Sequence, residues 1–545
     1  KKTAVTILQH QPARRRAAYL TTAVLTASTL ALAGCSLSVP SAQQPSDQAL
    51  APAADRAHGA SWQRENFENF YEQTITWGEC TAEHSGFSPE NEELLKETGF
   101  DYTNYECGTV TAPLNWGDPD DNRTLDLAVS RTVSTGSDQQ VPLFTNPGGP
   151  GIGGIQHAMS LATDPSFAPV LESHQLWGFD PRGIGASSPV VCESDSEVAA
   201  VQLAECAASS EVANYMGTSQ VARDMELLRS LAGGERLDYL GYSYGTMLGA
   251  TYATLFPEKA GRMVLDSAEN AQWGALTHNY DQMVAVSKAV GALADRCSDL
   301  TTSEGAAVTC PFTSEREMLD YQKSLTDKPL VASDGTEITG LELRDYLTSQ
   351  LYGPDVMQGD GLDLLGKAKA GDKEAVDALA QMIAHNSAEI DTAGQLVVCP
   401  SKPKTPDVEA LLAHMKEVGV PEFIGGPEIT DEVLAEFTEF DCAVLPATGT
   451  DITTSFDASK VSTDLLVIGI TGDHATPYQH GKELARQLGK ASFVTLEGTG
   501  HGASFSGRST CVDELATAYL VDGTVPEDGT VCQPDAPGED APEQQ

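Results

Sequence analysis

The residue best suited to chemistry is Ser243, at the centre of the sequence GYSYG (residues 241–245). This G-x-S-x-G pattern lies between an apolar run at 237–240 and a stretch of small residues at 246–253, so we expect a strand, a sharp turn and a helix. Such a turn forces strained backbone angles on the serine, and the flanking glycines let neighbouring chain pass closely. The dipole of the following helix favours negative charge at the serine oxygen. The pattern therefore predicts a nucleophile.

An acid and a histidine follow the predicted ends of two later strands. The run at 465–470 (LLVIGI) precedes Asp473, and the run at 492–496 (SFVTL) precedes His501. Because the carboxyl ends of parallel strands meet at one edge of a sheet, both side chains are expected near Ser243. Asp473 would orient the imidazole of His501, which would accept the serine proton. The order serine, acid, histidine predicts a catalytic triad.

A glycine-rich segment offers backbone amides for a developing oxyanion. Residues 141–146 are predicted to form a strand, and the sequence PGGPGIGG follows at 147–154. We expect the N–H groups of Gly149 and Tyr244 to form an oxyanion hole, with His157 nearby lining the pocket. The alternative, a phosphate-binding loop, fits poorly because no Lys-Ser/Thr follows and the G-x-G-x-x-G spacing is absent.

Several segments together resemble a known family. The combination is similar to the tripeptidyl aminopeptidase and proline iminopeptidase family of α/β-hydrolases, above all to secreted or envelope-anchored actinobacterial members with a TAP-like C-terminal region. The resemblance covers about residues 65–535 and implies a serine hydrolase that needs no cofactor. Proline iminopeptidases carry His-Gly-Gly-Pro-Gly, whereas Pro147 stands at the histidine position here, which argues against that activity. The matching segments are NPGGPG (146–151), WGFDPRGIGAS (177–187), GYSYGT (241–246), DHATP (473–477) and GTGHG (498–502).

The first residues predict export and lipid anchoring. Five Lys and Arg residues within 1–16 precede an apolar stretch at 17–33, which ends in LAGC. This pattern is typical of a signal peptide (residues 1–34), and LAGC is similar to a bacterial lipobox with lipid attached to Cys35. The Ser/Pro/Ala/Gln-rich segment 35–60 is expected to be a flexible tether. We therefore expect an extracytoplasmic enzyme held at the membrane.

The cysteine count fits an oxidising compartment. Of eleven cysteines, ten remain once Cys35 is assigned to lipid, and an even number suits disulfides. No C-x-x-C or H-E-x-x-H motif occurs, so no metal site is expected. The count leaves many pairings open, and the family resemblance implies sequential pairing. The implied disulfides are Cys80–Cys107, Cys192–Cys206, Cys297–Cys310, Cys399–Cys442 and Cys511–Cys532.

The composition is strongly acidic. The chain has 33 Lys and Arg against 78 Asp and Glu residues, a net charge of −45, which makes nucleic acid an unsuitable partner. The charge is expected mainly to form a solvated surface, and a second interpretation is attraction of a substrate's cationic amino terminus. With 545 residues of which 41% are hydrophobic, the chain can bury one large core.

The pattern of apolar runs predicts an α/β class protein with a doubly wound sheet. Residues 61–79 are predicted to be helical, 61–268 and 464–532 to form the two parts of the core, and 533–545 a disordered tail. The resemblance makes this an α/β-hydrolase fold with an eight-stranded, mostly parallel sheet and a mainly helical cap inserted after the sixth strand. The predicted strands are 107–114, 124–132, 141–146, 175–180, 237–242, 263–267, 464–470 and 491–497.

The long insert at 269–463 is predicted to be a cap over the active site, because a connection of this length with its own helical patterns should form a subdomain. Cys297–Cys310 and Cys399–Cys442 would brace it. Helical patterns are found at 280–294, 341–351, 373–385 and 408–418. Candidate carboxylates for a substrate ammonium group are Glu269, Asp281, Asp355, Asp360 and Glu439.

The resulting prediction is an extracytoplasmic serine peptidase that acts on peptides or proteins and releases short amino-terminal fragments. An endopeptidase, and an envelope esterase or acyltransferase with the same triad, remain open, as does the oligomeric state. A binding protein with an enzyme-like shell is a third reading, disfavoured by the complete triad. Asp180 and Arg182 are expected to order the turn after the strand at 175–180.

Overall fold

The computed structural model describes residues 52–535, apart from short gaps at 89–91, 94, 97–98, 134–139, 193, 197, 389–391 and 439–440. The predicted signal peptide, the lipidation site Cys35, most of the predicted tether, residues 536–545 of the predicted tail and Glu439 lie outside the described residues. No helix in the described part of the chain combines the length and apolar character needed to cross a membrane.

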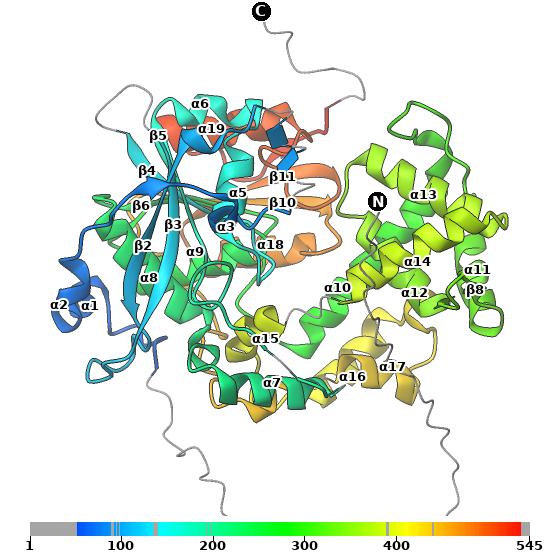
Figure 1. Cartoon of the computed structure of the whole chain (residues 1–545), viewed down its shortest axis with the longest axis horizontal. Helices are drawn as coiled ribbons and strands as arrows, with labels where there is room; N and C mark the ends of the chain where they lie inside the picture. Colours follow the sequence, from blue (N-terminus) through cyan, green and yellow to red (C-terminus); the bar gives the residue numbers. More distant parts are fainter. Residues whose placement is uncertain are drawn as a thin grey trace, which may run out of the picture. The chain divides into compact units, whose positions relative to one another are not determined.

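A ten-stranded mixed sheet organises the core, in the order β1-β2-β3-β5-β4-β6-β7-β10-β11-β12 (Figure 1). The strands from β5 through β12 in this order are parallel, and β1, β2 and β3 are antiparallel to their neighbours. The bounds are β1 Gly78–Glu79, β2 Tyr105–Pro113, β3 Thr124–Thr132, β4 Val141–Asn146, β5 His174–Phe179, β6 Leu237–Tyr242, β7 Ala260–Asp266, β10 Leu465–Gly472, β11 Ala491–Thr499 and β12 Thr530–Cys532.

The predicted α/β class and mostly parallel sheet are confirmed, but the predicted count of eight strands is wrong. All eight predicted strands form, and β1 and β12 are added at the two edges. These edge strands have two and three residues, too few to show an alternating pattern in the sequence.

Helices cover both faces of the sheet because successive strand residues point to opposite sides (Figure 1). On β10, Leu465 and Val467 pack in one cluster with α8, α9 and α18, whereas Leu466 and Ile468 pack in another with α5, α6 and α19. The helix bounds are α5 Gly154–Leu161, α6 Ala168–Leu171, α7 Ala199–Ser209, α8 Thr218–Leu231, α9 Tyr244–Leu255, α18 Tyr478–Leu488 and α19 Thr510–Asp522.

The helix predicted at 61–79 is shorter than expected. The segment forms two short helices, α1 (Ala60–Asn66) and α2 (Glu68–Tyr71), and is not helical after Tyr71, where Gln73 lies beside β2. Helix α3 spans Ala82–Ser85. The side chain of Gln73 donates to Thr111 O at 2.8 Å and accepts from Thr111 N at 2.9 Å. These are the two backbone groups of Thr111 on β2 that a neighbouring strand would otherwise bond. Helical continuation would lose these contacts.

The predicted tether also ends earlier than residue 60. The buried guanidinium of Arg223 on α8 donates to the carbonyl oxygens of Ala53, Asp55 and His58. Ala53 itself is buried. Five donors on one guanidinium can hold several carbonyls at once, so residues 52–60 pack on the core and the flexible-tether prediction is wrong for them.

The cap has its own hydrophobic core, formed by buried residues from Leu276 to Phe437. All described residues belong to one compact unit. The four predicted cap helices are present. Its elements are α10 Leu276–Asp295, α11 Glu315–Asp327, β8 Leu330–Val331, β9 Glu337–Ile338, α12 Gly340–Gln350, α13 Asp355–Lys369, α14 Lys373–Ala388, α15 Thr392–Val398, α16 Val408–Val418 and α17 Asp431–Phe437.

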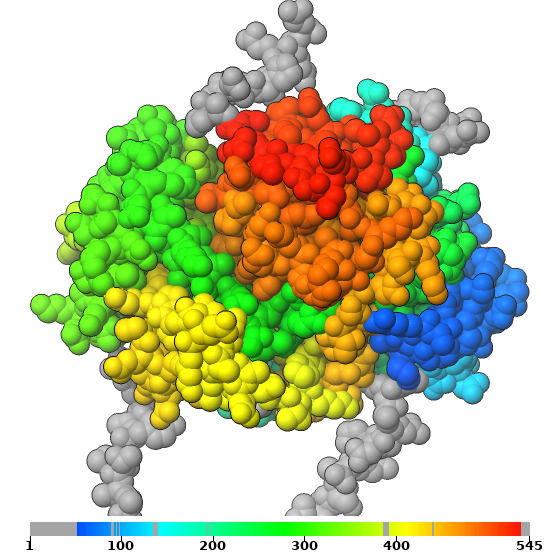
Figure 2. Space-filling model, turned by 180° about the vertical axis from the view of Figure 1, so that it is seen from behind, coloured from blue at the N-terminus to red at the C-terminus, as the bar shows by residue number. Residues whose placement is uncertain are grey.

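Two parts of the insert, around α15 and after α17, belong to the core and not to the cap. Leu396, Cys399, Cys442 and Phe456 pack in the cluster that also contains α8 and α9. The Cys399–Cys442 disulfide therefore lies on the core side, whereas Cys297–Cys310 lies within the cap. Figure 2 shows the green and yellow surface of the insert alongside the orange surface that follows β10.

The structure joins the ten described cysteines in five sequential pairs, the pairing that the family resemblance implied. Two of these pairs also close the ends of the sheet, since Cys80–Cys107 links the β1 region to β2 and Cys511–Cys532 links α19 to β12. The remaining pairs are Cys192–Cys206, Cys297–Cys310 and Cys399–Cys442.

Candidate active site

Ser243 occupies a tight turn between β6 and α9. Its φ of 53° and ψ of −124° are strained for a residue with a side chain. A Cβ at Gly241 would lie 2.6 Å from Gly245 O, and one at Gly245 would lie 2.7 Å from Asn146 O, so both positions require glycine. The Ser243 N–H donates to Asp266 O at 3.0 Å, which fixes the turn to the end of β7.

The glycine-rich segment after β4 lies against this turn. Gly148 has a φ of +96°, and a Cβ there would lie 2.6 Å from Tyr242 O and 2.8 Å from Ser243 Cβ. Gly148 N–H donates to Asn146 Oδ1. Within the described residues, the N–H groups of Gly149 and Tyr244 have no hydrogen-bond acceptor, so both remain available for a substrate oxygen.

Asp473 and His501 are directly paired beyond the ends of β10 and β11. Nδ1 of His501 lies 3.0 Å from Oδ1 and 3.1 Å from Oδ2 of Asp473, whose side chain is fully buried. Asp473 also accepts from the N–H groups of Ala475 and Thr476 and from the Thr476 hydroxyl. These contacts fix both the carboxylate and the ring orientation.

Burial and pairing act in opposite directions on this pair. Burial alone would raise the pKa of Asp473, but the charge of His501 and the hydrogen bonds hold it below its ordinary value. Burial alone would lower the pKa of His501, but the adjacent Asp473 carboxylate raises it above its ordinary value. Asp473 is therefore a carboxylate that stabilises an imidazolium.

The end of β7 anchors the loop that carries His501, through residues that sequence reasoning did not single out. The buried Asp266 carboxylate accepts from the N–H groups of Ala503 and Ser504, and Ser267 Oγ accepts from Gly502 N–H at 2.8 Å. Burial raises the pKa of Asp266. The only sequence feature that marks Asp266 and Ser267 is their position at the end of the strand predicted at 263–267.

These contacts bring the serine and histidine loops to the same place. Asp266 holds Ser243 through its carbonyl and the His501 loop through its carboxylate. Among the described residues, no hydrogen bond joins Ser243 Oγ directly to His501 Nε2; such bonds often tighten only when substrate binds.

Aromatic and imidazole rings surround His501. Tyr352, a cap residue after α12, lies edge-on to His501 with ring centroids 5.9 Å apart and to His474 at 4.5 Å. Burial lowers the pKa of His474 to about 4 and that of His157 to about 4. The ring of His157 packs edge-on against the ring of Tyr242, the residue before Ser243, with ring centroids 5.4 Å apart. The cap thus reaches the site through Tyr352, which no sequence motif marked.

The candidate ammonium-binding carboxylates already have partners. Asp281 pairs with His414 at 2.6 Å, Asp355 with Arg296 at 3.0 Å, and Asp360 accepts from Ser303 N–H. Each of these three carboxylates therefore already has at least one partner within the protein.

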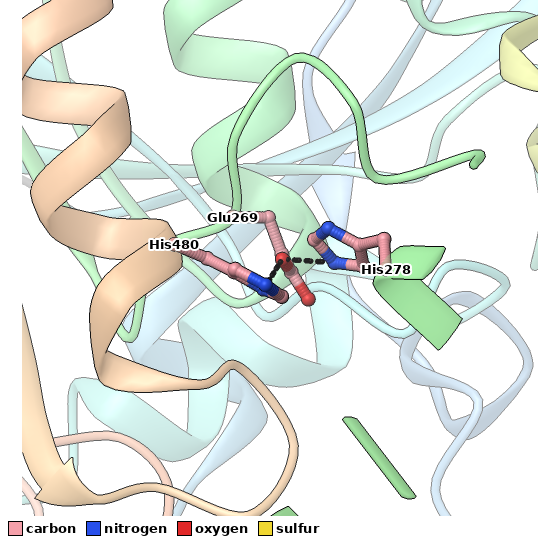
Figure 3. Close-up of side chains that lie close together, drawn as sticks. All are labelled: Glu269, His278 and His480. Atoms are coloured by element: carbon pink, nitrogen blue, oxygen red, sulfur yellow. Dashed lines mark ion pairs between the residues drawn. The ribbon is translucent and has the colours of Figure 1, made fainter. Parts of the chain in front are cut away.

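Glu269, the fourth described candidate, is buried beside His278 and His480 and pairs with both, as Figure 3 shows. Burial alone would raise the pKa of Glu269, but the two imidazoles lower it to about 2. Burial alone would lower the pKa of His480, but Asp281 and Glu269 raise it to about 9. No sequence motif connects Glu269 with His278 and His480.

Asp180 and Arg182 are structural, as predicted. Asp180 accepts from Ala186 N–H, which orders the turn after β5, and from Ile155 N–H at the start of α5. Arg182 forms two bonds to Asp224 on α8 in a fully buried pair.

Comparison with known proteins agrees with this geometry. A family profile described as alpha/beta hydrolase fold matches residues 141–288, and one described as TAP-like protein matches 429–532. Serine protease Hip1 of Mycobacterium tuberculosis is 30% identical over 473 residues, covering 78% of this chain and 87% of that protein.

Two further relatives differ in their named activities. Carboxylesterase B of Mycobacterium tuberculosis is 31% identical over 467 residues, covering 78% of this chain and 86% of that protein. Tripeptidyl aminopeptidase of Streptomyces lividans is 27% identical over 527 residues, covering 88% of this chain and 91% of that protein. With the sheet, the turn at Ser243 and the matched profiles, these similarities show that the chain is a hydrolase and belongs to the TAP-like α/β-hydrolase family.

Proposed function

We propose that the chain is a serine peptidase in which Ser243, His501 and Asp473 form the catalytic triad. The observation that carries this proposal is the contact of His501 Nδ1 with the buried Asp473 carboxylate, at the sheet edge where Ser243 occupies its strained turn. The relatives named serine protease and tripeptidyl aminopeptidase support a peptide substrate.

The reaction follows from these positions. Ser243 Oγ attacks the scissile carbonyl carbon while its proton passes to His501 Nε2, and Asp473 stabilises the imidazolium. The free amides of Gly149 and Tyr244 bind the oxyanion. His501 then protonates the departing amine, and a water molecule, deprotonated by His501, hydrolyses the acyl-enzyme.

For specificity and location, the proposal is an aminopeptidase that releases short amino-terminal fragments outside the cytoplasmic membrane. The tripeptidyl aminopeptidase relative, matched over 91% of its length, supports the first part. The signal-peptide pattern at 1–34 and the lipobox cysteine Cys35 support the second.

The test is peptide cleavage by the wild type and Ser243→Ala, read by mass spectrometry on matched peptides with free and acetylated amino termini. Ser243-dependent release of two- or three-residue fragments from free termini alone is the expected result. Equal cleavage of acetylated peptides would make the enzyme an endopeptidase. Absence of Ser243-dependent cleavage would contradict the peptidase proposal.

An esterase is the second candidate, because carboxylesterase B is as similar to this chain as the serine protease is. The same assay with short p-nitrophenyl esters distinguishes the two. Ser243-dependent ester hydrolysis without peptide cleavage would favour the esterase. Labelling by a fluorophosphonate probe in wild type but not in Ser243→Ala checks the nucleophile in either case.

Lipid anchoring has a separate test. Cells that express the wild type or Cys35→Ala are fed an alkyne fatty acid, and the label on the chain is measured. We expect label and membrane fractionation only for the wild type. Label retained in Cys35→Ala would contradict the assignment of Cys35.

A further inference from the structure

A carboxylate and two imidazoles converge beside the active site. Glu269 Oε2, His278 Nε2 and His480 Nδ1 all lie within 4.8 Å of one another, and each residue is more than nine-tenths buried. Figure 3 shows one oxygen of the Glu269 carboxylate facing a ring nitrogen of each histidine. Glu269 follows β7, His278 lies on the cap helix α10 and His480 lies on the core helix α18.

These three atoms have ion-pair distances but no directed hydrogen bond. Glu269 Oε2 lies 2.5 Å from His278 Nε2 and 3.3 Å from His480 Nδ1, yet all three atoms are buried without a hydrogen-bond partner of acceptable geometry. The rings of His278 and His480 are stacked with centroids 3.9 Å apart, which disfavours charging both. Buried polar atoms without hydrogen-bond partners cost free energy. A cation that accepts a lone pair from each of the three atoms would therefore stabilise the cluster.

We propose that Glu269, His278 and His480 bind a Zn²⁺ ion that joins the cap to the core. Two imidazole nitrogens and one carboxylate oxygen form a donor set that suits Zn²⁺. With ligand distances of about 2.0–2.2 Å, donors around a tetrahedral ion lie roughly 3–3.6 Å apart. The separation of Glu269 Oε2 from His480 Nδ1, 3.3 Å, already lies in that range, whereas His278 Nε2, 2.5 Å from Glu269 Oε2, must move outward by about 0.5–1 Å when the ion binds.

The surroundings of His480 match those of a metal ligand. Its other ring nitrogen, Nε2, lies 3.7 Å from Asp281 Oδ2, and Asp281 is held in turn by His414 at 2.6 Å. A carboxylate on the far nitrogen of a ligating histidine orients the ring and directs the opposite lone pair toward the metal. Asp281 therefore has a positioning role in this site.

The ion would hold the cap at its first helix and close to the nucleophile. Glu269 N–H donates to Thr246 Oγ1, and the Thr246 hydroxyl donates to Ser243 O at 2.6 Å. From the same cap helix, Gln282 donates to Ala475 O beside Asp473. A bound ion would thus connect the cap helix to the segments that carry Ser243 and Asp473, independently of the reaction that they perform.

The test uses the purified full chain, stripped with a chelator and titrated with ZnCl₂ in the presence of excess calcium to mask weak binding by the acidic surface. Calorimetry and elemental analysis after gel filtration should give one Zn²⁺ per chain. The apparent unfolding temperature should rise with Zn²⁺, and amide exchange at the start of α10 should slow. Absence of saturable binding would overturn the proposal.

Variants locate the ion. His278→Gln and His480→Gln should each weaken binding at least tenfold, whereas His84→Gln, on the short helix α3 (Ala82–Ser85), should bind like the wild type. Equal losses in all three, or in none, would contradict the site.

If either ligand variant fails to fold, as judged by circular dichroism in chelator, Asp281→Asn provides an independent test. Loss of the orienting carboxylate should weaken binding by about 10–100-fold. Unchanged affinity in Asp281→Asn would count against the proposed coordination by His480.

Discussion

At the scale of single residues, catalysis depends on how Asp473 and His501 share charge. Asp473 is buried and accepts hydrogen bonds from four donors, so it stays ionised and in place. Its charge raises the pKa of His501, while burial opposes that effect. A general base must be neutral to accept a proton, so this pairing also sets the pH range of activity.

We therefore predict that wild-type activity falls as the pH drops through a midpoint above the ordinary histidine pKa of about 6.5. Asp473→Asn should lower kcat/KM by roughly 10³–10⁴-fold and move this midpoint to lower pH, because the charge that favours the imidazolium is lost. A pH–rate profile measures both. The exposed Asp457→Asn is the control and should match the wild type.

Failure of the midpoint to move in Asp473→Asn would show that another group controls the acid limb. Asp266 is the group to examine in that case, because its buried carboxylate contacts the loop that carries His501.

Gly148 gives a second prediction at this scale. A Cβ there would lie 2.6 Å from Tyr242 O, at a φ of +96°. Gly148→Ala should destabilise the protein by about 1–3 kcal/mol and lower kcat at least tenfold, because the loop must move away from Ser243. Gly233→Ala is the matched control, since its φ is +76° but nothing lies within 4 Å. Gly233→Ala should lower the free energy of unfolding by about 1 kcal/mol and leave activity unchanged. Equal loss of activity in both variants would show that the clash at Gly148 is not the cause.

At the scale of elements, buried polar pairs connect helices to the sheet. Arg182 follows β5 and binds Asp224 on α8 as well as the carbonyl oxygens of Leu114 and Pro113 near the end of β2. Trp116 Nε1–H donates to the same carboxylate at 2.8 Å. Three elements therefore depend on one fully buried ion pair.

Arg182→Met should lower the free energy of unfolding by about 3–5 kcal/mol, because it leaves the Asp224 carboxylate buried without its charge partner. Urea denaturation measures the change. Arg486→Met removes the exposed pair with Glu483 and should cost less than about 1 kcal/mol. A loss below 1 kcal/mol for Arg182→Met would show that Asp224 is accommodated without the guanidinium.

At the scale of the whole molecule, the dominant feature is a net charge of −45 on 545 residues. Like charges repel in the compact state more than in the unfolded chain, and salt screens that repulsion. The five disulfides oppose unfolding by restricting the unfolded chain.

We predict that the apparent unfolding temperature rises when NaCl is increased from about 10 mM to about 300 mM, since the Debye length falls from roughly 30 Å to below 10 Å. Differential scanning calorimetry at fixed pH measures it. With the disulfides reduced, the unfolding temperature should be lower at every salt concentration and should also rise with NaCl. A falling unfolding temperature would mean that local ion pairs outweigh the repulsion.

Much of the architecture can be predicted from the sequence because it depends on local patterns. The strands predicted at 124–132 and 141–146 and the helix predicted at 408–418 have the observed bounds of β3, β4 and α16. Alternating or helical apolar periodicity is present in each segment itself. The same holds for the turn at Ser243, whose neighbouring glycines are adjacent in the chain.

Only the tertiary structure decided the features that depend on distant segments. The short edge strands β1 and β12, the end of α2 at Tyr71 and the packing of residues 52–60 against Arg223 all depend on partners far along the chain. Tyr352 beside His501, and Glu269 beside His278 and His480, likewise form when the cap meets the core. A sequence records residue types and spacing, whereas these contacts exist only once burial of apolar surface has brought separate elements together.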